Sequence, residues 1–408
     1  MLIIGIDVGG TNTKFGLIEN GQIIRTMQLS TNTFDVVRQL VNGAREIVQM
    51  SDRKFEEVQG ISLGFPGMVV DSVVLDSPNI GLQNCNIEEI LSDELRIPVI
   101  AKNDAEMATL AEHKLGAGNG CENMILITIG TGIGGGIIAN GKLYEGNGGA
   151  GELGHISVER DGRPCTCGRR GCAEQYVSMK ALDKLAKDTM AGYPNTCINV
   201  SGDGSIYASE LIRAYKRNDA CAKEVVDKYV EELTSYLLSI CNLFRPEKIV
   251  IGGGIVHAPE LISMVAKSCK EKNYGFANSP KVEIVPAVLG NQAGVLGAVV
   301  LFNSQEEENT VSEEITEMVS SLNSESEEQM VDRNVEGAVA EGSETNENDD
   351  VEEIGSADEQ FDERQKEQSD LMDSLFEASM ETIEETPAEV YDDPELINRV
   401  NDLLKKKD

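Results

Sequence analysis

The sequence predicts an α/β protein of about two domains, followed by an acidic tail. Two distant segments, 2–18 and 127–138, each have the pattern of a strand, a glycine-rich turn and a second strand. Residues 222–244 carry apolar side chains at the spacing of a long core helix. The composition changes near residue 304, which leaves about 300 residues, enough for roughly two domains with buried cores.

The net charge of −35 comes mostly from the C-terminal end. Residues 304–408 hold 35 of the 70 acidic residues but only 7 of the 35 basic ones. Such a segment cannot bury enough apolar surface to offset the entropy of ordering, so we expect most of it to be disordered. Apolar residues at helical spacing near 371–383 and 396–404 could dock on a protein partner, although a pure solubility role fits equally well.

Composition also excludes several classes of function. No run of eighteen apolar residues occurs, so we expect no membrane association, and no basic leader opens the chain. Residues 1–303 offer no basic or aromatic surface typical of nucleic-acid binding. Together with a thiol-rich motif described below, this pattern predicts a cytoplasmic protein.

The first strand runs from Leu2 to Asp7 and enters a glycine-rich turn. Backbone amides at such a turn can approach phosphate oxygens closely because glycine has no Cβ. Asp7 is placed to hold a hydrated Mg²⁺. An ordinary hairpin turn would explain the glycines as well. The candidate nucleotide contacts here are Asp7, Gly9, Gly10, Thr11, Asn12 and Lys14.

A second glycine hairpin makes the nucleotide interpretation stronger. It lies at 127–138, and a third element, a buried strand at 248–251, delivers further glycines where a purine or ribose could pack on bare backbone. Neither a Walker loop nor a GxGxxG fingerprint is present. The candidate contacts from these two segments are Thr131, Gly132, Gly134, Gly253 and Gly254.

Between the hairpins, a short buried strand at 98–102 ends in Asn103 and Asp104. A carboxylate at this point could remove a proton from an attacking hydroxyl during phosphoryl transfer. The same pair could instead cap the helix predicted at 105–113. The residues alone leave both roles open.

A cluster of one histidine and three cysteines predicts a zinc site. His155, Cys165, Cys167 and Cys172 fall within eighteen residues, and thiolates with an imidazole are suitable ligands for a closed tetrahedral zinc that holds structure. Glu152 and Glu174 flank the cluster and would stay free to bind a polyhydroxylated ligand. Reduced loop cysteines are the alternative, whereas the odd total of nine cysteines disfavours a disulfide framework.

These motifs resemble the ROK family of sugar kinases, over residues 1–303. The resemblance rests on both hairpins, the segment from Glu152 to His155, the cysteine cluster ending in Glu174, and Ser178. It implies the actin-like ATPase (ribonuclease H-like) fold, with two domains of mixed sheets and flanking helices that hold nucleotide and sugar in the cleft between them. The expected boundaries are 1–117 plus 291–303 for a small domain, 118–290 for a large one, and 304–408 for the tail.

The resemblance further implies ATP-dependent phosphorylation of a hexose, with Asp104 as catalytic base and Mg²⁺ and Zn²⁺ as metals. His155 would use one ring nitrogen for zinc and the other for sugar, while His113 and His257 would have surface or structural roles. Gly64–Gly67 resembles a loop beside the sugar, although a plain turn fits as well. The implied sugar contacts are Asn79, Asn103, Asp104, Glu152, His155 and Glu174.

Glucose is the first expectation because the motif around His155 and the cysteines resembles that of the bacterial glucokinases. The lack of tryptophan weakens this assignment slightly, and N-acetylmannosamine, N-acetylglucosamine or another hexose are alternatives. ROK enzymes commonly form dimers or tetramers, so a homo-oligomer is expected. An inactive scaffold acting through the tail would need a damaged site. Sugar-sensing repressors of the family resemble this chain only after a helix-turn-helix, and here the first hairpin begins near residue 5.

Overall fold

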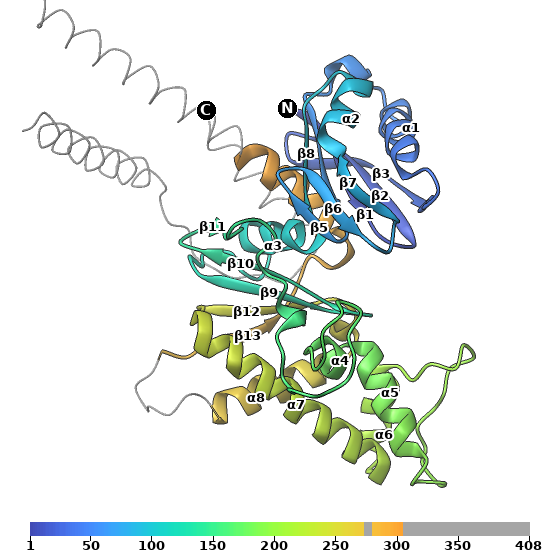
Figure 1. Ribbon diagram of the computed structural model, residues 1–408, viewed down its shortest axis with the longest axis vertical. Helices are drawn as coiled ribbons and strands as arrows, with labels where there is room; N and C mark the ends of the chain where they lie inside the picture. The colour runs from blue at the N-terminus through green and yellow to red at the C-terminus, as the bar shows by residue number, and fades with distance from the viewer. Residues whose placement is uncertain (273–279, 305–408) are drawn as a thin grey trace, which may run out of the picture. The chain divides into compact units, whose positions relative to one another are not determined.

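The computed structural model describes residues 1–272 and 280–304 (Figure 1). The tail and its two candidate docking runs lie outside the described residues. The described chain contains two five-stranded mixed sheets and a small antiparallel sheet formed by β5 (Met68–Val70), β6 (Val73–Ser77) and β7 (Leu82–Asn86). No helix of the described ranges has the length and apolar character that crossing a membrane requires.

The first sheet contains the first glycine hairpin. Strands β1 (Leu2–Val8) and β2 (Asn12–Glu19) pair antiparallel, whereas β4 (Gly60–Phe65) and β8 (Val99–Asn103) run parallel to β1. Nearly every residue of β1 is buried, because alternate residues pack on helical residues from 36–48 and 87–95 on one face and from 295–302 on the other. The sheet order is β3 (Gln22–Ser30), β2 (Asn12–Glu19), β1 (Leu2–Val8), β4 (Gly60–Phe65) and β8 (Val99–Asn103).

Helices α1 (Val36–Gln49) and α2 (Ile87–Leu95) pack with the first sheet. Residues 293–304 are also helical and pack on it, with Val295, Val299 and Phe302 beside Ile3 and Ile18. Residues 293–304 thus return to the first sheet, although the expected domain boundaries remain a prediction.

The second sheet contains the second glycine hairpin. Strand β9 (Met124–Ile129) pairs antiparallel with β10 (Ile133–Ala139) and parallel with β12 (Lys248–Gly252). A core of helices lies against it, formed by α5 (Met179–Met190), α6 (Ala208–Lys216), α7 (Ala220–Phe244) and α8 (Pro259–Glu271). The order is β11 (Lys142–Leu143), β10 (Ile133–Ala139), β9 (Met124–Ile129), β12 (Lys248–Gly252) and β13 (Glu283–Pro286).

Helix α3 (Asp104–Lys114) contacts strands of both sheets (Figure 1). Glycines allow this close approach. A Cβ on Gly136 of β10 would lie 2.2 Å from Thr109 Oγ1, and a Cβ on Gly64 of β4 would lie 3.3 Å from the Cα of Asp104. On a third side, a Cβ on Gly297 would lie 2.1 Å from the carbonyl oxygen of Met107. Packing from three directions therefore fixes the helix that begins at Asp104.

Candidate active site

Asn103 caps α3, which leaves Asp104 available for another role. The Asn103 Oδ1 accepts hydrogen bonds from the amides of Ala105 (2.8 Å) and Glu106 (3.3 Å). The Glu106 carboxylate accepts one in return from the Asn103 amide at 3.1 Å, which completes a capping box. The sequence left two roles open for Asn103 and Asp104, catalysis and capping of the helix. The structure shows that Asn103 caps the helix.

Asp104 occupies the first helical position and is largely shielded from solvent. Burial, together with the nearby negative charges of Asp7 and Glu152, raises its pKa to about 7, against the opposing effect of the hydrogen bond from the Ala105 amide. A carboxylate with a pKa near neutrality suits general-base chemistry, since it can both accept and release a proton at physiological pH.

The first glycine hairpin places Asp7 and Lys14 opposite each other at the end of β1 and β2. The Lys14 Nζ lies 3.1 Å from the Asp7 carboxylate and donates to the carbonyl of Asn291 at 3.4 Å. In the turn, the Gly9 amide donates to the carbonyl of Asn12 at 2.9 Å. A single carboxylate beside a glycine turn suits Mg²⁺, which proteins usually hold through one or two carboxylates plus substrate phosphates.

In the second hairpin, the glycines make room for neighbouring groups. The Ile133 amide donates to Glu174 Oε2 at 3.0 Å, and a Cβ on Gly132 would lie 2.5 Å from that oxygen. A Cβ on Gly134 would lie 3.1 Å from the Cβ of Ala105, so this glycine admits helix α3. Packing therefore favours glycine at both positions, in addition to the nucleotide contacts predicted for them.

Gly253 and Gly254 lie beside the end of β9. Gly253 has φ +79°, and a Cβ there would lie 2.7 Å from the carbonyl of Ile129. A Cβ on Gly254 would approach the same carbonyl at 3.7 Å. The third glycine segment is thus adjacent to the second hairpin, as one nucleotide site would require. Thr131 at the hairpin tip is exposed.

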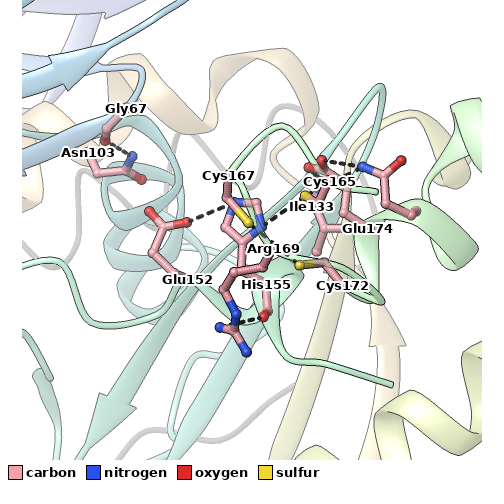
Figure 2. Close-up of polar contacts among 11 residues, drawn as sticks. Gly67, Asn103, Ile133, Glu152, His155, Cys165, Cys167, Arg169, Cys172 and Glu174 are labelled. Atoms are coloured by element: carbon pink, nitrogen blue, oxygen red, sulfur yellow. Dashed lines mark hydrogen bonds and ion pairs between the residues drawn. The ribbon is translucent and has the colours of Figure 1, made fainter. Parts of the chain in front are cut away.

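The predicted zinc ligands converge (Figure 2). The ligand atoms of His155, Cys165, Cys167 and Cys172 all lie within 4.8 Å of one another. His155 Nδ1 is 3.6 Å from Cys165 Sγ, and the sulfurs of Cys167 and Cys172 are also 3.6 Å apart. A tetrahedral zinc with ordinary bond lengths has ligand–ligand edges of about 3.6–3.8 Å, so the four side chains fit this ion.

Turns and short pairings hold the cysteine cluster. Pro164 and Arg170 form an isolated antiparallel bridge. Gly168 and Gly171 have φ of +85° and +75°, and a Cβ on Gly171 would lie 1.6 Å from the carbonyl oxygen of Glu159. Both glycines therefore meet a backbone requirement of the tight turns in this segment.

The predicted sugar-contacting residues lie on several elements. His155 turns its Nε2 toward Glu152, 3.9 Å from Oε2, while its Nδ1 faces the zinc ligands (Figure 2). This orientation allows the two separate uses predicted for the imidazole. Glu174 begins the short helix α4 (Glu174–Val177). Burial raises the pKa of Glu152, and the charge of Glu174 adds to this effect, against that of His155.

Two asparagines complete the predicted set. The Asn103 Nδ2 donates to the carbonyl of Gly67 at 2.7 Å (Figure 2), so the loop 64–67 lies next to this residue. Asn79 is exposed and lies beside Gly10 of the first hairpin. The other histidines match their expected roles, since His113 is buried against the carbonyl of Cys121 and His257 is exposed.

Three acidic residues near α3 were missed by the sequence analysis. Glu106 completes the capping box, and the spacing Asn-x-x-Glu before an apolar run could have predicted it. Its pKa is raised to about 7 by burial. Buried Glu112 accepts hydrogen bonds from three backbone amides, and Glu145 pairs with Lys102. No local pattern signals these two, because their partners are distant or belong to the backbone.

Comparison with known proteins matches the family suggested by the motifs. The ROK family model covers residues 3–305. The glucokinase of Halalkalibacterium halodurans is 35% identical over 318 residues, which cover 74% of this chain and 95% of that protein. The DNA-binding transcriptional dual regulator NagC of Escherichia coli is 32% identical over 266 residues, 64% of each chain.

Among solved structures, the Streptomyces griseus ROK glucokinase in complex with glucose and AMPPNP has a TM-score of 0.64 and 31% identity. That match covers 74% of this chain and 99% of the glucokinase. The described residues therefore have the mixed α/β fold of the ROK sugar kinases, as predicted. On its sequence and its fold, this chain belongs to the ROK family.

Proposed function

We propose that the protein is a sugar kinase, a phosphotransferase that moves the γ-phosphoryl group of MgATP to a hydroxyl of a hexose. The observation that carries this proposal is the state of Asp104. It starts a helix whose cap is supplied by Asn103, and its pKa is raised to about 7. A carboxylate that is not needed to cap the helix and that has a pKa near 7 is better suited to be a catalytic base than to be a structural group.

In the proposed reaction, Asp104 accepts the proton of the sugar hydroxyl as the oxygen attacks the γ-phosphorus in line, and ADP leaves. The amides of the two glycine hairpins hold the phosphates. Lys14, which pairs with Asp7 in this structure, is placed to turn toward phosphate oxygens once Asp7 faces a cation. Bound Mg²⁺ would neutralise charge on the phosphates, with Asp7 as its nearest protein carboxylate.

We further propose glucose as the preferred acceptor, phosphorylated at its C6 hydroxyl. Support comes from the glucokinases of Halalkalibacterium halodurans and Streptomyces coelicolor, which are 35% and 33% identical to this chain over three quarters of its length. The proposed sugar contacts are Asn79, Asn103, Glu152, His155 and Glu174. N-acetylmannosamine, N-acetylglucosamine and other hexoses stay as the alternative acceptors.

Zinc is proposed as a structural ion. His155, Cys165, Cys167 and Cys172 would hold it and would fix the orientation of the imidazole beside Glu152. The three cysteines must stay reduced to bind a metal, which favours the cytoplasm as the compartment. A homo-oligomer and a protein partner for the tail remain predictions.

The acceptor can be identified by competition. Purified protein with MgATP would receive equal concentrations of glucose, mannose, N-acetylglucosamine and N-acetylmannosamine, and the phosphorylated products would be separated and assigned by NMR. The proposal expects glucose 6-phosphate to form fastest. A product dominated by an N-acetylhexosamine phosphate would replace glucose with that sugar and keep the reaction class. A phosphate on a hydroxyl other than C6 would overturn the proposed regiochemistry.

A further inference from the structure

An ion pair joins the edges of the two five-stranded sheets. Lys102 lies on β8, the edge strand of the first sheet, and Glu145 follows β11, the edge strand of the second sheet, by two residues. Their side chains form an ion pair in which Lys102 is only 14% exposed and Glu145 is 47% exposed. Water therefore screens this pair less than it would screen two fully exposed charges.

Glu145 also organises the loop that follows it. Its backbone carbonyl accepts hydrogen bonds from the amides of Gly148 (2.9 Å) and Ala150 (3.2 Å). The loop is rich in glycine, and Gly146, Gly148, Gly149 and Gly151 all have positive φ. Such a backbone has many alternative conformations, so it loses much entropy when it is held in one.

The far side of this loop rests on β5 of the small sheet, and β5 contacts β8. A Cβ on Gly148 would lie 2.5 Å from Val70 Cγ1, and a Cβ on Gly149 would lie 3.5 Å from Met68 Cε. Packing fixes the middle of the loop, while the ion pair fixes its beginning. The loop ends at Glu152, one of the carboxylates whose charge raises the pKa of Asp104.

The two ends of the ion pair are thus attached to two parts of the proposed site. Lys102 is two residues before Asp104 on the same strand-to-helix connection, and Glu145 starts the loop that ends at Glu152. The positive charge of Lys102 also lowers the pKa of buried Glu106, whereas the negative charges of Glu145 and Glu152 raise it. Removing the lysine would leave several carboxylates close together without this cation.

We propose that Lys102 and Glu145 are positioning residues that hold the glycine-rich loop 145–152 across the two sheets and so position Glu152 at the sugar site. This proposal rests on the proposed function, because Glu152 is taken as a sugar contact. Loss of the pair would weaken sugar binding, since the loop would have to be ordered again by the sugar. The phosphoryl-transfer step itself would change little, because neither side chain is a catalytic residue.

The test is a double-mutant cycle with Glu145→Gln, Lys102→Met and the combined variant. Each single variant should raise the sugar KM by about threefold to tenfold, with kcat within about twofold of wild type and the KM for ATP unchanged. The double variant should be no worse than the single ones. The matched control is Glu260→Gln, which breaks the surface pair between Lys216 and Glu260 and should leave all three constants unchanged.

A second readout, hydrogen exchange, does not depend on turnover. The amides of 146–152 should exchange faster in Glu145→Gln and Lys102→Met than in wild type, and Glu260→Gln should leave them unchanged. A sugar KM equal to wild type, additive effects of the two substitutions, or unchanged exchange in 146–152 would each overturn the positioning role. If the wild-type protein phosphorylates no sugar but the two substitutions speed up exchange as expected, the proposed function is wrong. The role of Lys102 and Glu145 in holding the loop would still be supported.

Discussion

At the scale of single residues, the environment of Asp104 explains its chemistry. Its pKa is raised by burial and by the charges of Asp7 and Glu152, and the hydrogen bond from Ala105 opposes them only in part. The sequence predicted this aspartate from its place after a buried strand and from the family motif. It could not predict the pKa, because Asp7 and Glu152 lie far away in the chain and are brought near only by the fold.

The pH dependence of catalysis follows from this pKa. A base that must be ionised loses activity as the pH falls through about 7, so kcat/KM for the sugar should drop about tenfold per pH unit in the acid range. Steady-state kinetics between pH 5.5 and 9 would measure it, with circular dichroism at each pH as control for the fold. A flat profile down to pH 5.5 would contradict the role of Asp104.

The same pKa predicts a cost in stability. The pKa of Asp104 in the folded protein lies above the value of about 3.9 for an unperturbed aspartate, so its stabilising contribution is complete below about pH 4 and is lost as the pH rises through about 7. Asp104→Asn should therefore raise the Tm relative to wild type at pH 8, and the gain should shrink toward pH 4. Thermal unfolding at both pH values checks this. An equal or lower Tm for the variant at pH 8 would show that ionisation of Asp104 does not destabilise the folded protein.

At the scale of elements, the sequence predicted the strands of both glycine hairpins and the buried strands at 98–102 and 248–251, because apolar runs and glycine turns are local signals. The helices α3 and α7 extend one or two residues beyond the expected ranges. Contacts between elements were not predictable. The partners Lys102 and Glu145 are 43 residues apart, and neither residue type is unusual in a surface segment. The packing of Gly136 against Thr109 could not be predicted either, because the glycines of this hairpin suggested a phosphate-binding turn.

That packing can be tested with a single methyl group. In Gly136→Ala the new Cβ would lie 2.2 Å from Thr109 Oγ1 and 2.8 Å from its Cβ, so α3 must shift. Overpacking of this kind costs about 1–3 kcal/mol of unfolding free energy, and the displaced Asp104 should lower kcat. Urea unfolding and kinetics measure both effects. The control is Gly202→Ala, where a Cβ meets nothing within 4 Å; equal behaviour of the two variants would contradict the packing argument.

The zinc knuckle is the second element with a direct test. Metal analysis of reduced protein purified without chelators should give one zinc per chain, and Cys172→Ser should lose most of it, because three ligands hold zinc far less tightly than four. The sugar KM should rise in parallel, since His155 would lose its fixed orientation. Wild-type protein without bound zinc would rule out the metal site, whatever its activity.

At the scale of the whole molecule, the described residues form first one sheet and then the other, and the last of them pack again on the first sheet. Residues 293–304 return to the first sheet, where a Cβ on Gly60 would lie 2.2 Å from the Phe302 ring. The family motif predicted this return, whereas periodicity alone did not. Helix α3, which begins at Asp104, contacts both sheets, so the proposed base is held by the same packing that joins the two parts of the chain.

The central claim is that this packing serves sugar phosphorylation by Asp104. The most direct measurement is sugar-dependent release of ADP from MgATP across a panel of hexoses and N-acetylhexosamines, with Asp104→Asn as the blank. We predict that at least one sugar elicits ADP release and that the variant is slower by at least about a hundredfold with unchanged sugar binding. No response to any sugar from folded, zinc-loaded protein, or an Asp104→Asn variant that keeps most of its turnover, would contradict the account.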